Sequence, residues 1–187
     1  MYETSDIRKG LRIEIDGTPF QIIEFQFVKP GKGTAFTRTK VRNILTGAVL
    51  DRTFKTGEKL QPTNTEDREM QYLYNDGSEF YFMDNSNYEQ ISLSSEVIGD
   101  AANYLLEEMN VSVGFFNGKP IGLSLPNFVT MEVIETSPGE KGNTVTGATK
   151  PASLITGYTV NVPLFIKQGE LLKIDTRTGE YVERVKA

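Results

Sequence analysis

The sequence predicts an all-β protein made of three small β-barrels, and two observations carry this prediction. Short apolar runs alternate with turns rich in Gly, Pro, Asn and Asp along the whole 187-residue chain. Two proline-containing segments, residues 61–65 and 125–127, divide the chain into thirds. The predicted domains are therefore residues 1–64, 65–127 and 128–187, an SH3-like barrel followed by two OB-like barrels.

In the first third, strands are predicted at residues 11–15, 20–27, 35–42 and 48–54. The second and third of these flank a run in which proline and glycine favour a turn, Lys29-Pro30-Gly31-Lys32-Gly33-Thr34. This run is predicted to be the tip of a β-hairpin, called the finger below, with Lys32 alone between two glycines. A lysine in a glycine-rich turn is also an ordinary solvated loop residue, and the motif by itself leaves that alternative open.

One helix is predicted, and it lies in the middle domain. Ser94 or Ser95 can cap its N-terminus, and apolar residues follow at helical spacing, namely Val97, Ile98, Ala101 and Leu105. This apolar stripe is interpreted as core packing in preference to a partner site. The remaining predicted strands are residues 70–74, 79–83, 111–115, 129–135, 144–149, 158–162, 171–175 and 181–185.

Composition excludes most enzymatic chemistry. The chain has no cysteine and no histidine, so Ser-His-Asp catalysis, Cys-His catalysis and His-based metal sites are impossible. The finger lacks the spacing of a Walker phosphate loop, and the adjacent carboxylates Glu107 and Glu108 would point apart on a helix. We therefore expect no catalytic residue, no metal and no bound cofactor.

The chain's ends and apolar runs give an expectation about location. The N-terminus has neither the basic region nor the apolar core of a signal peptide. No apolar run is long enough to span a membrane. A cytoplasmic location is therefore expected.

The net charge of −5 is unevenly distributed along the chain. Residues 1–64 contain 11 basic and 7 acidic residues, residues 65–128 contain 2 and 11, and residues 129–187 contain 7 of each. A basic first third can face phosphate while an acidic middle third is held away from it. Chance imbalance is the alternative for the basic excess.

Three cations alternate along the strand that descends from the finger, namely Arg38, Lys40 and Arg42. Period-two spacing places them on one face of a sheet if no bulge intervenes. A solvated sheet face also shows charges at this period, but usually of both signs. A phosphate-facing surface is therefore the favoured interpretation.

Two segments resemble the bacterial elongation factor P family, and the resemblance spans the whole chain. Residues 29–33 are similar to that family's modified finger. The second segment matches the spacing of the family's C-terminal signature, with Lys150-Pro151-Ala152, then Gly157, then Val160-Asn161-Val162-Pro163, then Ile166 and Gly169. The ending, residues 179–185, is also typical of the family.

The resemblance implies an L-shaped molecule similar in outline to tRNA, with a KOW/SH3-like domain and two OB-like domains. It implies binding to both ribosomal subunits between the peptidyl and exit tRNA sites, where the family promotes peptide bond formation at consecutive prolines by positioning peptidyl-tRNA. The implied partners are the ribosome, peptidyl-tRNA, the mobile stalk of the large subunit and an enzyme that modifies Lys32. The implied state is a monomer.

The resemblance also implies roles for single residues. Lys32 matches the residue that carries a covalent extension, β-lysyl or another group, and that points toward the peptidyl-transferase centre. Tyr181 and Arg184 match positions that contribute to tRNA or ribosome binding. The third-domain loop Gly142-Asn143-Thr144 departs from the family's common Gly-Asp-Thr; Asn keeps one acceptor oxygen but loses the charge. A role for this loop near the anticodon or exit-site codon is expected.

Two other functions stay open from the residues. One is a paralogue of the same architecture that acts on other stalling sequences. The other is a general RNA-binding module in which Tyr72, Tyr74 and Tyr81 stack on bases. The acidic surroundings of these tyrosines favour core packing over stacking.

Overall fold

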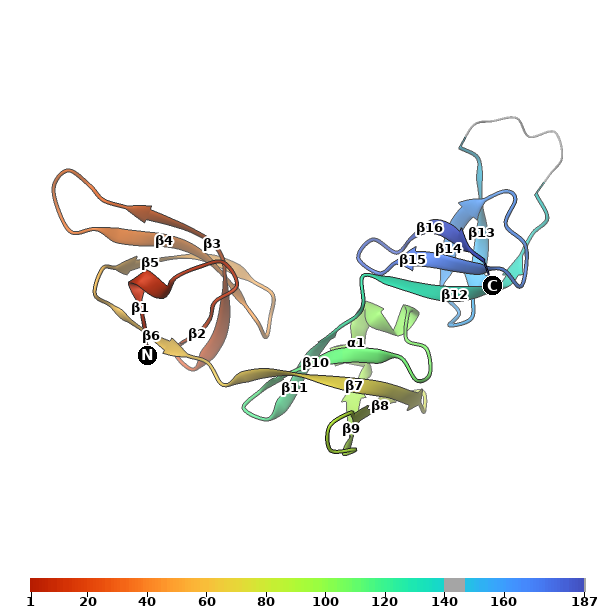
Figure 1. Ribbon diagram of the computed structural model, residues 1–187, viewed down its shortest axis with the longest axis horizontal. Coiled ribbons are helices and arrows are strands. Elements are labelled where there is room, and N and C mark those ends of the chain that lie inside the picture. Colours follow the sequence, from red (N-terminus) through yellow and green to blue (C-terminus); the bar gives the residue numbers. More distant parts are fainter. Residues whose placement is uncertain (140–146, 187) are drawn as a thin grey trace. The chain divides into compact units, whose positions relative to one another are not determined.

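The computed structural model describes residues 1–139 and 147–186, and it is built from antiparallel sheets with one short α-helix (Figure 1). The chain divides into two compact units. Met1–Asp67 and Gly114–Ile121 form the first, and Arg68–Val113 and Gly122–Ala187 form the second. The predicted all-β class is confirmed.

A six-stranded sheet forms most of the first unit, in the order β1-β6-β2-β3-β4-β5. Its strands are β1 (Tyr2–Glu3), β2 (Arg12–Ile15), β3 (Thr18–Val28), β4 (Phe36–Asn43), β5 (Val49–Lys55) and β6 (Lys59–Pro62). A 3₁₀ turn, Thr4–Asp6, follows β1. β6 pairs with both β1 and β2, so Gln61 and Pro62, the first residues of the predicted boundary segment 61–65, belong to this sheet.

The strands of the first sheet enclose one apolar core. Its buried members are Ile7, Leu11, Ile13, Phe20, Ile22, Val41, Phe54 and Leu60. Ile22 on β3 pairs with Val41 on β4, and Glu24 pairs with the next residue, Lys40, so Ile23 is the extra residue of a β-bulge. β4 pairs with β5 without interruption. Side chains therefore alternate between the two faces along the whole of β4. Along β3 the alternation is interrupted at Ile23, and the residues after it face the opposite side from the one that strict alternation would give.

The second sheet has the order β11-β10-β7-β8-β9. Its strands are β7 (Thr65–Asn75), β8 (Glu79–Asp84), β9 (Gln90–Ser94), β10 (Asn110–Phe116) and β11 (Lys119–Ser124). β7 and β8 form the predicted hairpin, because their residues pair from Met70 with Asp84 to Asn75 with Phe80.

The helix between β9 and β10 is shorter than predicted. Helix α1 covers only Ser95–Ile98, and the Ser94 hydroxyl caps it by accepting a hydrogen bond from the Val97 amide at 3.4 Å. Gly99, with φ of +55°, ends the helix, and a 3₁₀ turn continues over Gly99–Asn103. Ile98 and Leu105 are nevertheless buried, as the core-packing interpretation requires.

The third sheet has the order β14-β13-β12-β15-β16. Its strands are β12 (Phe128–Thr136), β13 (Thr149–Leu154), β14 (Thr159–Pro163), β15 (Leu171–Asp175) and β16 (Glu180–Val185). The predicted strand at residues 144–149 is wrong where it can be compared. Its residues 144–146 lie outside the described residues, and the strand begins only at Thr149 and runs on to Leu154.

Within the second unit, Tyr104 belongs to the core of the third sheet. Its ring meets the ring of Tyr158 edge-on at 5.3 Å, and the Tyr158 hydroxyl donates to the Gly179 carbonyl at 3.0 Å. A Cβ at Gly179, where φ is +78°, would overlap the hydroxyls of both tyrosines. The Thr156 hydroxyl adds a hydrogen bond to the Asn103 carbonyl at 2.6 Å. These contacts tie the segment before β10 to the third sheet.

Candidate nucleic-acid interface

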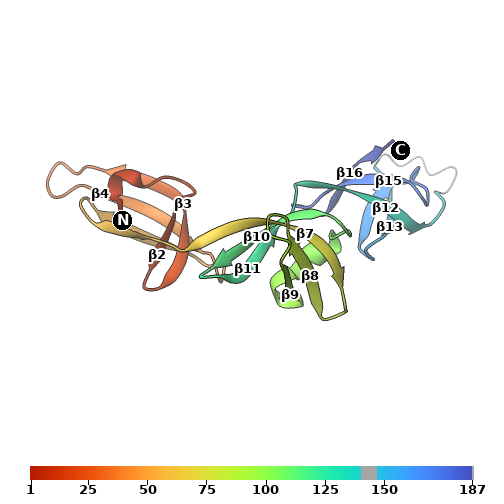
Figure 2. The same cartoon turned by 60° about the horizontal axis from the view of Figure 1, so that its bottom comes forward.

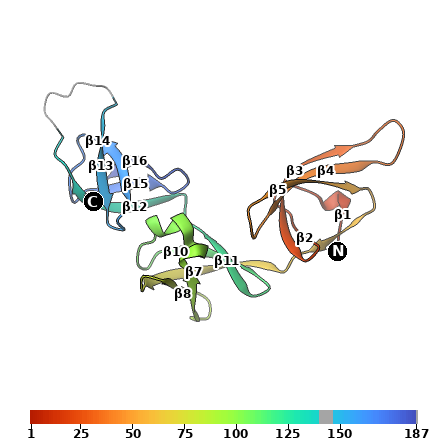
Figure 3. The same cartoon turned by 180° about the vertical axis from the view of Figure 1, so that it is seen from behind.

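The finger is the connection between β3 and β4. The strands stay paired as far as Val28 and Phe36, and residues 29–35 form a loop that extends past the other strands of the sheet (Figures 1, 2 and 3). Lys32 is exposed there, and within residues 1–139 and 147–186 no group pairs with its ammonium. The predicted hairpin tip is confirmed, and its cation is available to another molecule.

The two glycines beside Lys32 differ in what they contribute. Gly33 has φ of +101°, a conformation that L side chains rarely adopt, whereas Gly31 has no positive φ. Neither position is crowded, since the nearest atom to a Cβ built on Gly33 is Pro30 Cγ at 4.0 Å. Backbone conformation therefore requires glycine at residue 33. Ahead of them, Lys29 is exposed and Pro30 is half-buried.

The three cations of β4 share one face, as the period-two spacing predicts. Arg38, Lys40 and Arg42 are exposed, and the residues between them, Thr37, Thr39 and Val41, are buried on the opposite side. We call the side that carries Arg38, Lys40 and Arg42 the basic face. With Glu24, Gln26, Asp51 and Thr53 on the flanking strands, Arg38 and Lys40 line a hollow of about 700 Å³.

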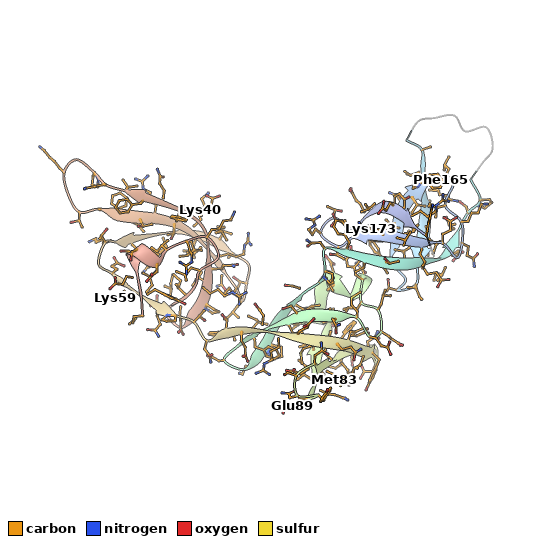
Figure 4. The ribbon with its side chains drawn as sticks, in the orientation of Figure 1. Lys40, Lys59, Met83, Glu89, Phe165 and Lys173 are labelled. Carbon is orange, nitrogen blue, oxygen red and sulfur yellow. The ribbon has the colours of Figure 1, made fainter. Side chains whose placement is uncertain are left out.

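The basic face also contains carboxylates that the sequence pattern did not show. Glu24 and Asp51 lie on either side of Lys40, which is labelled in Figure 4. Glu24 Oε2 is 3.9 Å from Lys40 Nζ. Arg38 instead lies between Gln26 and Thr53 and stacks over the Phe36 ring at 5.4 Å. The face therefore has both signs of charge, with cations in excess.

In the third sheet, Arg184 is held by an aromatic ring and a carboxylate. Its guanidinium lies 5.0 Å from the centre of the ring of Phe165, which is labelled in Figure 4. Its Nη1 is 3.5 Å from Glu170 Oε1. Phe165 is 55% exposed, so the stacked pair meets solvent. Glu170 Oε2 is buried without a hydrogen-bond partner among the described residues.

Tyr181 lies on the same side of β16 as Arg184. The register places Tyr181 beside Ile174 and Arg184 beside Leu172, with a bulge between Lys173 and Ile174. Cross-strand partners share a face, and both partners here belong to the core. Tyr181 is consequently half-buried against that core, with only part of its ring open to a partner.

The structure does not test the predicted role of the third-domain loop. Gly142, Asn143 and Thr144 lie outside the described residues, so their role stays a prediction.

The tyrosines of the rival RNA-binding interpretation are engaged with other protein groups. Tyr72 is buried, and Tyr74 stacks on Tyr81 with ring centres 4.7 Å apart. The Tyr81 hydroxyl donates to Asp76 at 2.9 Å, and this hydrogen bond raises the pKa of Tyr81. Core packing and mutual stacking account for these rings without a base.

Residues 1–139 and 147–186 contain no group of three or more Asp and Glu residues that could hold a metal ion. Over the same residues, no helix has the length and apolar character needed to cross a membrane.

Sequence reasoning overlooked the aromatic residues beside the predicted cations. Phe165 under Arg184 follows a strand in an ordinary loop, and no local signal marks it. Phe25 and Phe27 lie in the strand predicted at residues 20–27, and both are exposed, which the prediction of a strand does not specify. The sequence did contain one sign of a break in this strand. Ile22 and Phe25 are an odd number of residues apart, so strict alternation would place these two apolar side chains on opposite faces of the sheet.

Family comparisons cover almost the entire chain. A family model described as the elongation factor P KOW-like domain matches residues 3–60, the elongation factor P OB domain matches residues 65–123, and the elongation factor P C-terminal domain matches residues 129–184.

Curated relatives and solved structures agree with these matches. Proteins named elongation factor P from Pelotomaculum thermopropionicum and Carboxydothermus hydrogenoformans are each 55% identical over 185 residues, which is 99% of this chain and 100% of theirs. The relative of that name from Bdellovibrio bacteriovorus is 54% identical over 99% of this chain and 98% of its own. A structure of eukaryotic translation initiation factor 5A from Methanococcus jannaschii shares the fold, with a TM-score of 0.55 and 23% identity over 66% of this chain and 93% of that one.

Proposed function

Because this chain belongs to the elongation factor P family of translation factors, we propose that it binds the ribosome between the peptidyl and exit tRNA sites and promotes peptide bond formation at consecutive prolines. The observation that carries the proposal is the position of Lys32. It is a cation at the tip of a hairpin with no partner among the residues that the structure describes, and it adjoins a strand whose exposed face is rich in cations.

The proposed mechanism is positional. Proline is a poor reactant in the ribosome because its ring fixes φ and constrains the nascent chain. A factor that holds peptidyl-tRNA in a reactive orientation lowers the barrier without supplying an acid or a base. Lys32, lengthened by a β-lysyl or another covalent group, would reach the 3′ end of the tRNA, and the ribosome itself would form the bond.

The other site residues would hold RNA. Arg38, Lys40 and Arg42, together with Lys29, would grip backbone phosphate, and Tyr181 and Arg184 would contact tRNA or the ribosome through the third domain. We further propose a cytoplasmic monomer that also meets the mobile stalk of the large subunit and an enzyme that modifies Lys32.

The decisive experiment compares Lys32 in the finger loop with Lys59 on β6, two exposed lysines of the first unit. Lys32→Ala and Lys59→Ala, the second at a lysine paired with Glu3 on β1 (Figure 4), are tested in a reconstituted system translating a proline stretch. We expect Lys32→Ala to lose rescue of stalled ribosomes and Lys59→Ala to retain it. Rescue by Lys32→Ala as fast as by modified wild type would remove the cationic arm from the mechanism.

The covalent extension has its own test. The intact mass of the native protein, followed by peptide mapping across residues 25–40, should show an added group on Lys32. A native Lys32 of unmodified mass in protein that is fully active would show that no extension is needed.

Phosphate contact by the basic face predicts a change in salt dependence. Arg38→Gln should weaken ribosome association most at low salt and make its salt dependence shallower by about one unit of slope, because one fewer counterion is released. Lys59→Gln, which removes a charge from another strand, serves as the matched control. Equal salt slopes for wild type and Arg38→Gln would exclude Arg38 from phosphate contact.

A further inference from the structure

Two large aromatic side chains are exposed on the finger hairpin. Phe25 is 48% and Phe27 is 60% exposed, and both lie on β3, close to the loop that carries Lys32. A pair of exposed phenylalanines is costly in water, because each ring keeps apolar area that burial would remove from solvent. Their shared position therefore indicates a partner surface.

Both rings lie on the side of the hairpin opposite the basic face. Phe25 pairs with Thr39 and Phe27 pairs with Thr37, and these threonines are buried on the side away from Arg38. The bulge at Ile23 produces this arrangement, because it moves Glu24 to the basic face and the two phenylalanines to the other.

Short side chains separate the phenylalanines from β5. Across β4, Thr39 is followed by Arg52 and Thr37 is followed by Phe54 on β5. The Thr39 hydroxyl is used internally, since it donates to the Arg52 carbonyl at 2.6 Å. We call this side the aromatic face. Its exposed residues are Phe25, Phe27 and Arg52, and Thr37, Thr39 and Phe54 are the buried residues of the same rows.

The charge of the aromatic face has one sign. The carboxylates of this part of the sheet, Glu24 and Asp51, both lie in the row of Lys40 on the basic face. The aromatic face instead presents the exposed Arg52, whose guanidinium lies 5.6 Å from the ring of Phe54, a buried residue of the core. Phe25 and Arg52 lie in one row with Thr39 between them. Two exposed rings and an exposed cation on one side of the sheet, with no carboxylate in their rows, suit a partner that offers both flat rings and negative charge.

We propose that the aromatic face is a stacking platform for unpaired bases of RNA, with Arg52 at the adjoining phosphate. The proposal rests on the function proposed above and adds a base-contacting surface to its phosphate-gripping one. Aromatic side chains on a sheet stack bases of single-stranded RNA regardless of sequence, because every base has a flat π-face.

The spacing of the rings favours bases that are not in a duplex. Phe25 and Phe27 are two residues apart on one strand, so their Cα atoms lie about 6.8 Å apart at the usual rise. This is twice the roughly 3.4 Å that separates successive bases along a duplex strand. Splayed bases of a single-stranded end or loop meet this spacing, whereas bases inside a helix are closed to it.

The test uses the full chain and a single-stranded hexamer of adenylate. We expect the NMR signals of both phenylalanine rings to shift on titration, since a stacked base imposes its ring current on them. Phe27→Leu, which keeps an apolar side chain but removes the ring, should weaken hexamer binding roughly 5- to 100-fold. Phe27→Trp should bind at least as tightly as wild type. Both substitutions are at an exposed position, and thermal unfolding checks that the fold is kept.

Three results would overturn the platform. The rings could stay silent at millimolar hexamer, Phe27→Leu could bind as wild type does, or sedimentation could show that Phe27→Leu turns a dimer of this chain into a monomer. Failure of the platform is separable from failure of the proposed function. If Arg38→Gln weakens ribosome association and Phe27→Leu does not, the translation role stands and the platform falls.

Discussion

Replacing Gly33 by alanine should destabilise the native conformation of the finger loop and leave the Lys32 side chain itself unchanged. Gly33 adopts φ of +101°, where a side chain is strained, and no atom lies closer than 4.0 Å to the added Cβ. The cost is therefore backbone strain alone, about 1–3 kcal/mol for a residue held in such a region. In an exposed loop the chain can relieve this strain by moving, so the native loop becomes a minor conformer.

The size of the functional loss follows from that population shift. A penalty of about 1–3 kcal/mol shifts the equilibrium between native and relaxed loops roughly 5- to 150-fold, which is the upper limit of the loss in apparent activity. Gly31→Ala adds the same methyl group two residues away, at a position without positive φ. We expect a clearly smaller loss there.

The assay is the rate of proline-stretch translation in a reconstituted system, measured against factor concentration. Each variant is first checked by intact mass, so that both carry the same group on Lys32. Equal activities for Gly31→Ala and Gly33→Ala would refute the argument that the conformation of residue 33 positions the lysine.

Three further predictions concern other contacts. Gly179→Ala should lower the free energy of unfolding in urea by about 1–3 kcal/mol more than Gly169→Ala does. Both positions have positive φ, but only at residue 179 would a Cβ overlap the tyrosine hydroxyls. Equal losses of stability in the two variants would contradict the overlap. Burial, with a hydrogen bond to a second tyrosine, raises the pKa of Tyr104 to about 12, whereas the unfolded value is near 10. The protonated Tyr104 side chain therefore contributes to the free energy of unfolding in full below pH 10, and this contribution is lost as pH rises to 12. Its upper limit is about 2.7 kcal/mol, reduced by solvent screening, and Tyr104→Phe should show correspondingly less alkaline destabilisation than wild type. Glu24→Gln removes the carboxylate beside Lys40 and should tighten ribosome association about two- to fivefold at low salt, and unchanged binding would show that this ion pair does not compete with RNA.

Local patterns in the sequence predicted the strands that have an apolar side. Period-two alternation placed Arg38, Lys40 and Arg42 on one face because β4 pairs without a bulge. The same reasoning did not find β6, where Leu60 is the one buried residue and pairing partners lie far away in the sequence. Strands held by distant backbone partners leave little trace in their own residues.

The helix illustrates a different limit. The apolar positions were right, because Ile98 and Leu105 are buried, but the backbone between them is not one helix. Gly99 ends the regular turn, and a 3₁₀ turn carries the chain on to the same core. Apolar spacing reports which residues are buried and is less informative about how the backbone brings them there.

Charge and exposure at the site depended on neighbours in space. The sequence showed the cations of the basic face but not the carboxylates beside Lys40, which come from two other strands. Phe165 under Arg184 left no local signal for the same reason, whereas the odd spacing of Ile22 and Phe25 did mark a break in the alternation of β3. The register of a sheet decides such neighbours, and register is fixed by pairing across the whole sheet.

The bulge at Ile23 controls the direction in which the finger leaves the sheet. Bulges bend a strand and increase its twist, and Val28, where the loop begins, lies five residues further on, about 17 Å at the usual rise. A change of 10° at the bulge therefore moves the start of the loop by about 3 Å, the length of a hydrogen bond. The direction in which the loop carries Lys32 therefore depends on the bulge nine residues earlier. Substitutions around residue 23 can displace Lys32 even when residues 29–35 are unchanged.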